Sequence, residues 1–386
     1  MKKMSKRILA LLLSLVMALS CMAFASAETG AAETPQLQFN NGQLKIVVFA
    51  DCQDDVFADG RMLQLMNDAL DKEQPDLVVF TGDNVVQAVK PLNQAAIDQI
   101  LEPVVSRGIP FAVTFGNHDG EYFSKEEMLA YYQSFDGCLS YDADPALTGV
   151  GTCNIPVYAS DGSAIAYNLW IIDSNMYDEE NGGYDYVHQD QLDWYVKTSE
   201  ALEAEAGYKV PSMMFQHIVV PEIYECLREA TAEDTNTRTY QGKTYALQLN
   251  ENAEGYLGEF PCPPTVNGGQ FDTLLSRGDV VGIVTGHDHV NDFIGSYQGI
   301  DFIQFPGINF ASYGDDAVRG YGVIVIDEDN TDSYEAYSVQ YSDVYADSSV
   351  LDEAETVLQA FVRSLQLMFQ RIMDSLNELF AMLKAA

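Results

Sequence analysis

Two histidines stand two residues apart in the stretch VTGHDHVND, directly after a run of apolar residues. They are His287 and His289, and the whole chain contains only five histidines. Alternate side chains of an extended strand point to the same face, so both imidazoles can reach one ligand if the extended geometry persists. An isolated pair of this kind is more often a polar turn after a buried strand. The other strand ends of the chain decide between a turn and a binding site.

Four further apolar runs also end in side chains that bind metals or move protons. In chain order the residues at these ends are Asp51 with Gln53, then Asp83, then Asn117, His118 and Asp119, and finally His217. Ligand sites in open α/β sheets lie at the carboxyl ends of the strands, so these ends can converge. Each residue taken singly has a structural explanation, as a turn former or a buried histidine. Their succession at five strand ends favours a shared site.

The donor types in this set suit two divalent metal ions. Two aspartates, one asparagine and three histidines, with one glutamine to spare, provide enough ligands for two ions that share a carboxylate. Metals of intermediate softness accept imidazole and oxygen donors together. Two such ions ~3.5–4 Å apart can activate a water molecule and clamp a phosphoryl group. The pattern therefore predicts a dinuclear centre for phosphoryl chemistry.

These residues need a sheet to bring them together, and the periodicity of the chain predicts one. Buried strands are expected over 44–50, 76–82 and 109–116, with helices over 60–75 and 91–108 between them. This alternation predicts a parallel sheet with covering helices. From about Thr152 strands predominate, and the clear helices there cover about 189–205 and 269–277. A second, mixed sheet packed on the first accounts for the change.

Two segments do not fit the sheet pattern. The stretch 230–265 is rich in Gly, Pro, Asn and acidic residues without a clear period, so we expect an extended loop, and long loops of this kind often cover functional sites. Residues 352–385 have apolar side chains every three or four positions and predict a long amphipathic helix. That helix either docks on the domain, associates with a second copy or attaches the protein to a surface.

Charge and the N-terminal sequence bear on location and partners. The formal net charge is −38, which disfavours a nucleic-acid partner because the phosphate backbone would be repelled. Residues 1–27 combine basic residues, a short apolar run and a small-x-small end, as in a secretory signal cleaved after Ala27. Lipid attachment through Cys21 is the less favoured alternative. Residues 28–43 are expected to be a polar lead-in to a domain over 44–345, and the protein is expected to be secreted or extracytoplasmic.

The motifs DCQ, GDNV, GNHD, QH and GHDH, in this order, resemble the calcineurin-like metallophosphoesterase superfamily. The resemblance covers roughly residues 44–327. With HIVVPE and GHDHVNDF, the chain is most similar to the branch that contains Dcr-type phosphatases and purple-acid-phosphatase-like proteins. The resemblance implies an α/β fold, an αββα sandwich of two mixed sheets flanked by helices. It also implies two divalent ions, Mn, Fe or Zn.

The resemblance also implies a role for each candidate residue. Asp51, Asp83 and His289 would hold the first ion, and Asp83 would bridge to the second. The second ion would be completed by Asn117, His217 and His287. His118 would lie beside the scissile phosphate and assist the leaving group, and Asp119 would orient it.

Two positions depart from the superfamily pattern. Gln53 occupies the place of a usual histidine and is either a weak ligand or a turn residue. Val86 occupies the place of the tyrosine of purple acid phosphatases, which argues against a ferric centre. The expected function is an exported phosphohydrolase that cleaves phosphate esters, monoesters slightly ahead of diesters, by attack of a metal-bridging hydroxide. The alternative is a catalytically weak surface binding protein with a degenerate site.

Overall fold

The first of two large sheets carries the N-terminal half of the candidate site. The computed structural model describes residues 36–345 and residue 362. The sheet has the order β15–β14–β1–β2–β3. Its strands are β1 (Gln43–Phe49), β2 (Leu77–Thr81), β3 (Phe111–Thr114), β14 (Gly320–Asp327) and β15 (Tyr334–Gln340). β1, β2 and β3 run parallel, so their carboxyl ends lie at one edge, while β14 runs antiparallel to β1.

The second sheet is mixed, as the sequence predicts, and has the order β10–β12–β13–β11–β6–β5–β4. Its central strands β5, β6, β11 and β13 are parallel. The strands are β4 (Cys153–Tyr158), β5 (Ile165–Ile171), β6 (Ser212–Phe215), β10 (Ala253–Leu257), β11 (Val280–Thr285), β12 (Asn291–Tyr297) and β13 (Ile300–Gln304). The ends of β6 and β11 supply the remaining histidines of the site.

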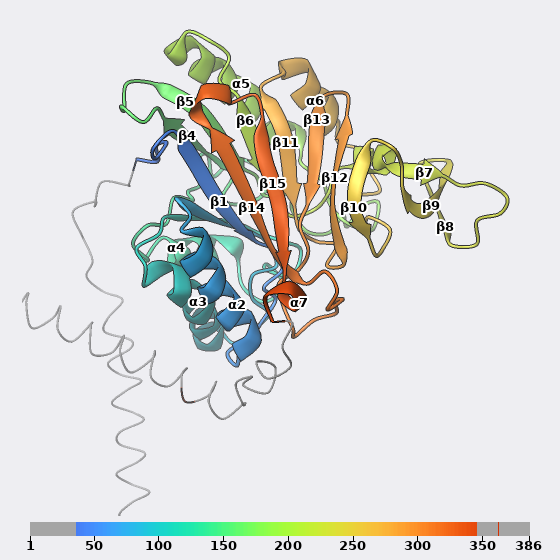
Figure 1. Ribbon diagram of the computed structural model, residues 1–386, viewed down its shortest axis with the longest axis horizontal. Helices are drawn as coiled ribbons and strands as arrows, with labels where there is room; N and C mark the ends of the chain where they lie inside the picture. The colour runs from blue at the N-terminus through green and yellow to red at the C-terminus, as the bar shows by residue number, and fades with distance from the viewer. Residues whose placement is uncertain (1–35, 346–361, 363–386) are drawn as a thin grey trace, which may run out of the picture.

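Alternation along the strands explains why the two sheets stack. In β1, Leu44, Ile46 and Val48 join the apolar layer between the sheets, whereas Val47 and Phe49 face the helices. A strand buried on both faces reads as a continuous apolar run. Helices α2 (Gly60–Glu73), α3 (Lys90–Val105) and α4 (Lys125–Tyr132) cover the first sheet. Helices α5 (Gln189–Ala206) and α6 (Gln270–Arg277) cover the second, which completes the αββα sandwich (Figure 1).

The stretch 230–265 is not an extended loop, and that prediction is wrong. It contains β8 (Thr237–Tyr240), β9 (Lys243–Leu249) and the edge strand β10. With β7 (Leu227–Glu229), strands β8 and β9 form a separate sheet of order β7–β9–β8, which projects from the sandwich in Figure 1. The β8–β9 turn has positive φ at Gln241 (44°) and Gly242 (82°), as a tight hairpin requires.

The remaining described elements are short. They are the 3₁₀ helices η2 (Pro221–Cys226) and η3 (Glu328–Asn330) and the helix α7 (Tyr341–Val344).

The domain starts before residue 44. Leu37 and Phe39 are buried between the sheets, and the Phe39 amide donates to Tyr158 O at 2.9 Å. The end of the expected lead-in therefore belongs to the domain. No helix within the described residues is long and apolar enough to span a membrane. The expected signal and amphipathic helix lie outside the described residues.

Candidate metal centre

The predicted metal ligands come together at the carboxyl ends of five strands. Asp51 follows β1, Asp83 follows β2, Asn117 follows β3, His217 follows β6 and His287 follows β11. Each of these side chains is at most 7% exposed although all are polar. Buried polar groups need partners, and a group of this kind is uncommon unless it serves a site. The convergence expected from strand ends is therefore present in the fold.

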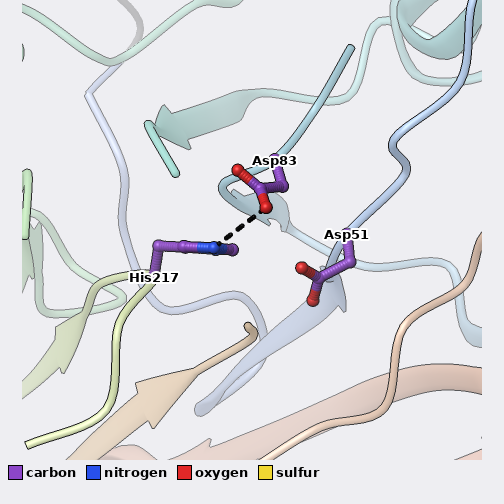
Figure 2. A group of neighbouring side chains, drawn as sticks. All are labelled: Asp51, Asp83 and His217. Atoms are coloured by element: carbon purple, nitrogen blue, oxygen red, sulfur yellow. Dashed lines mark ion pairs between the residues drawn. The ribbon is translucent and has the colours of Figure 1, made fainter. Parts of the chain in front are cut away.

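Asp51, Asp83 and His217 form the centre of the group. Figure 2 shows the three side chains pointing toward one another, and one potential ligand atom from each lies within 4.8 Å of the others. Asp83 Oδ2 is 3.2 Å from His217 Nε2. Asp83 contacts both His217 and Gln53, as a carboxylate shared by two ions would.

The three histidines are each anchored through the outer nitrogen of the ring. His217 Nδ1 lies 2.9 Å from Thr81 O, His287 Nε2 lies 3.2 Å from Cys262 O and His289 Nδ1 lies 2.9 Å from Tyr313 O. A carbonyl oxygen only accepts, so each outer nitrogen must carry the proton. In the neutral imidazoles the inner nitrogens therefore carry no hydrogen, and their lone pairs point into the site. Metal-binding histidines are oriented in this way.

In the neutral forms, the inner nitrogen of His217 faces three other acceptors. His217 Nε2 is 3.2 Å from His287 Nδ1 and 3.2 Å from Asn117 Oδ1, as well as from Asp83. Four acceptors at this spacing repel one another unless a proton on His217 or a metal ion lies among them. A divalent ion with imidazole and oxygen ligands satisfies all four at once. The residues present therefore fit the second metal position.

The electrostatics of the site lead to the same demand for positive charge. Burial acts to lower the pKa of His217, but the carboxylate of Asp83 outweighs it and raises that pKa to about 9. Burial, with the neighbouring charge on His217, lowers the pKa of His287 to about 3. His217 thus favours the cationic form and His287 the neutral form, so the pair favours a single positive charge between them.

Asp51, His289 and Gln53 form a second group of candidate ligands next to the first. Asp51 Oδ1 lies 3.4 Å from His289 Nε2 and has no hydrogen bond, while Oδ2 accepts from the His287 amide at 3.0 Å. Gln53 donates from Nε2 to Asp83 Oδ2 at 3.1 Å, and its buried Oε1 is also without a hydrogen-bond partner. Two buried oxygens without partners are acceptors that a cation would satisfy. Gln53 therefore lies among the candidate ligands, with an oxygen that a metal ion could use.

The backbone at the ligands is strained, and small residues make room for them. Asp51, Asp83 and His287 have positive φ values of 51°, 49° and 77°, which non-glycine residues adopt mainly where structure imposes it. A Cβ at Gly116 would lie 2.1 Å from Asp83 Oδ1. A Cβ at Gly286 would lie 2.7 Å from Asp51 Oδ2. The glycines of GNHD and GHDH are therefore needed because neighbouring ligands occupy the space of a side chain.

His118 lies at the edge of the site, but Asp119 does not orient it, and that prediction is wrong. His118 Nδ1 is 2.8 Å from Glu121 Oε1. Asp119 instead accepts from the amides of Asn84 at 2.9 Å and Gly116 at 2.8 Å, and so ties the loops after β2 and β3 together. Burial, with the charge of Asp83, raises the pKa of Asp119 to about 7. Glu121 takes the place expected for Asp119.

Tyrosines around the ligands are the part of the site that sequence motifs did not identify. The Tyr177 hydroxyl lies 3.1 Å from Asn117 Nδ2 and 3.1 Å from Glu121 Oε1. The ring of Tyr184 packs edge-on against His287 at 4.3 Å, and the ring of Tyr313 stacks on His289 at 4.1 Å. Tyr177 and Tyr313 are 43% and 53% exposed, so they lie at the surface next to the buried candidate ligands.

The chain is similar to several known proteins. The chain is 29% identical to the probable inactive purple acid phosphatase 14 of Arabidopsis thaliana, over 72% of the chain and 74% of that protein. It is 25% identical to the phosphatase DCR2 of Saccharomyces cerevisiae, over 69% of the chain and 47% of that protein. A dimetal phosphatase from Danio rerio superposes with a TM-score of 0.47 and 13% identity, covering 78% of this chain and 99% of that one. The calcineurin-like phosphoesterase family model matches residues 44–291, and the chain belongs to that family.

Proposed function

We propose that the protein is a metal-dependent phosphoesterase that uses two divalent ions, Mn, Fe or Zn, at this centre. The observation that carries the proposal is the set of lone pairs that converge between Asp83, Asn117, His217 and His287. Such a set needs positive charge at its centre, and a divalent ion would meet this need while coordinating all four side chains at once. Asp51, His289 and Gln53 provide a second set next to it, which shares Asp83.

The chemistry follows from what two ions supply and from what the chain adds. Bound ions would withdraw charge from the phosphoryl oxygens and lower the pKa of a water molecule, so that hydroxide is available near neutral pH. Asp83 holds the two positions together, and its Oδ1 accepts from the His118 amide at 2.8 Å. The backbone of His118 is therefore held beside the site, and Nδ1 of its side chain contacts Glu121. There the imidazole can donate a proton to the departing oxygen.

The preferred substrates in this proposal are phosphate monoesters, with diesters second. The support is the word phosphatase in the names of the relatives from Arabidopsis thaliana and Saccharomyces cerevisiae. The net charge of −38 favours substrates without additional anionic groups and disfavours nucleic acid. We further propose export through the N-terminal signal, and self-association or surface attachment through residues 352–385; both rest on the sequence.

Metal analysis combined with two chromogenic substrates tests the function. We expect the purified protein to bind about two divalent ions and to hydrolyse p-nitrophenyl phosphate faster than bis-p-nitrophenyl phosphate. Removal of the ions with chelator should abolish both activities, and restored metal should recover them. Asp83→Asn should lose both ions because it removes the shared charge, whereas Asp272→Asn, at an exposed position of α6, should retain them. Full activity after verified metal removal would refute the proposal.

One observation favours a second candidate, a metal-binding protein with little turnover. Gln53 replaces a nitrogen ligand, and the relative from Arabidopsis thaliana is named as probably inactive. Such a protein would bind two ions and inorganic phosphate but release no p-nitrophenol above the rate of the Asp83→Asn variant. The proposed enzyme would show turnover that rises in step with metal content.

A further inference from the structure

A chain of three hydrogen bonds joins Asn117, a proposed metal ligand, to His118, the proposed proton donor. Asn117 Nδ2 donates to the Tyr177 hydroxyl at 3.1 Å. The same hydroxyl donates to Glu121 Oε1 at 3.1 Å, and this oxygen lies 2.8 Å from His118 Nδ1. The four residues come from the loops after β3 and β5, so the chain crosses from one sheet to the other.

The donor and acceptor roles fix the direction of every bond in this chain. Asn117 Oδ1 faces the second metal position, so its amide nitrogen must point outward and can only donate. Tyr177 has a single hydroxyl hydrogen, and because it accepts from Asn117 it gives that hydrogen to Glu121. A carboxylate of Glu121 that already accepts from Tyr177 accepts again from His118 Nδ1–H. Each group thereby sets the orientation of the next.

For His118, these hydrogen bonds leave Nε2 as the free ring nitrogen. Nδ1 is occupied by Glu121, and Nε2 has no hydrogen-bond partner among residues 36–345. The His118 side chain is 37% exposed, so without Glu121 its ring would be free to rotate in solvent. Fixing an exposed side chain in a productive orientation is worth up to about 100-fold in rate when the displacement avoided is near 1 Å.

Tyr177 is itself held by a second aromatic contact. Its ring stacks on Tyr184 with the centroids 6.1 Å apart, and the ring of Tyr184 packs against His287, another ligand of the second position. An isolated β-bridge joins Tyr177 and Tyr184. Tyr177 and Tyr184, at the two ends of this small loop, therefore contact the proposed ligands Asn117 and His287. These contacts hold the Tyr177 hydroxyl in a defined position.

We infer that Glu121 and Tyr177 are positioning residues that hold Nε2 of His118 toward the leaving group and couple its orientation to the second metal position through Asn117. The inference rests on the proposed phosphoesterase function for its catalytic part. Its structural part, that Nδ1 of His118 carries a hydrogen donated to Glu121, stands on the hydrogen-bond chain alone. No motif of the sequence marks either residue, because their roles depend on contacts between separate loops.

The catalytic part is tested with substrates that differ in the basicity of the leaving group. In Glu121→Gln and Tyr177→Phe, kcat for phenyl phosphate should fall about 10- to 100-fold, while kcat for 2,4-dinitrophenyl phosphate should change less than about threefold, because that leaving group departs without a proton. KM should stay unchanged, and kcat is measured with saturating metal because Tyr177→Phe also removes the acceptor of Asn117 Nδ2. In a His118→Asn background, neither substitution should cause a further loss. Glu126→Gln, an exposed carboxylate at the start of α4, is the matched control and should behave as wild type.

The structural part has a readout that does not require turnover. Long-range ¹H–¹⁵N spectra of the imidazoles report which nitrogen carries the hydrogen, and His118→Asn identifies the signals of His118 among five histidines. We expect a protonated, hydrogen-bonded Nδ1 in the wild type and a shifted Nδ1 signal in both variants. Unchanged Nδ1 signals, or equal losses of kcat on both substrates, would overturn the inference. A wild-type protein that binds two ions without turnover would refute the proposed function, while the spectra would still decide on the hydrogen-bond chain.

Discussion

Gln53→His should convert the first metal position from a weak site to a strong one. Gln53 lies at that position, with Nε2 on Asp83 and a buried Oε1 that has no hydrogen-bond partner. An amide oxygen is a harder and weaker donor than a neutral imidazole. Its backbone has a φ of 39°, a left-handed conformation that histidine adopts more readily than most residues. The substitution therefore replaces the donor without forcing a new backbone.

The magnitude follows from what Gln53 contributes and what histidine adds. Leaving Oε1 unsatisfied costs about 1–3 kcal/mol, so metal binding already regains part of this in the wild type. The imidazole is a stronger donor than the amide oxygen, but the substitution also loses the hydrogen bond to Asp83. The net result should be an affinity for the first ion that is about 10- to 100-fold higher. This corresponds to about 1.4–2.8 kcal/mol. Preference at this position should shift from Mn or Fe(II) toward Zn, while the second position stays as it is.

Titration of the metal-free protein with Mn and with Zn measures both positions. In the wild type we expect one tight and one weaker binding step, with the weaker ion lost on dialysis. Gln53→His should retain two ions through the same dialysis, and Gln53→Leu, which removes both the donor and the acceptor, should retain fewer than the wild type. Identical affinities and metal preferences for the wild type and Gln53→His would refute the assignment of Gln53 to the first position.

Three further substitutions test other parts of the structure. Gly116→Ala should weaken metal binding by about tenfold or more in a titration, because its Cβ would lie 2.1 Å from Asp83 Oδ1 and displace the shared carboxylate. Lys125→Met should lower the free energy of unfolding in urea by about 3–5 kcal/mol, because it leaves the fully buried Asp173, 2.8 Å from Lys125 Nζ, without its cation. The free energy of unfolding of Asp54→Asn minus that of the wild type should be about 2–3 kcal/mol larger at pH 7 than at pH 4. The reason is that burial raises the pKa of Asp54 from 3.8 to about 6, so the folded state binds this proton more tightly and loses stability as the pH rises through that range.

Matched controls separate these effects from general damage. Gly282→Ala in β11 places a Cβ 3.2 Å from the terminal methyl group of Ile303 and should leave metal affinity unchanged. Lys90→Met breaks an ion pair with Glu127 in which both side chains are about half exposed, and should cost no more than about 1 kcal/mol. Losses as large in these controls as in the test variants would contradict the site-specific explanations, and a pH-independent effect of Asp54→Asn would contradict the raised pKa.

The sequence predicts the sandwich well because its strands are buried on both faces. β1, β2 and β3 appear within two residues of their expected ends, since continuous apolar runs bounded by helices leave few alternatives. The hairpin of β8 and β9 was missed for the opposite reason. Its first strand, Thr237–Tyr240, is mostly exposed and has no apolar alternation. The Gln241–Gly242 turn was the available signal.

In the site, as in the fold, periodicity predicts the residues at strand ends, whereas contacts between loops depend on packing. The ligands follow strand ends, so their convergence was predictable from topology. The partner of His118 was not, because Asp119 and Glu121 are both near it in sequence and only the turn of the loop decides which one reaches the ring. Tyr177 and Tyr184 belong to a loop whose position depends on the second sheet. No spacing in the sequence identifies such contacts.

Anomalous X-ray diffraction from crystals grown with Mn²⁺ tests the central claim most directly, because it locates each ion without relying on activity. We predict two peaks about 3.5–4 Å apart on either side of Asp83. The first should lie among Asp51, Gln53 and His289, and the second among Asn117, His217 and His287. A single peak, or peaks that do not share Asp83, would contradict the dinuclear centre from which the proposed function follows.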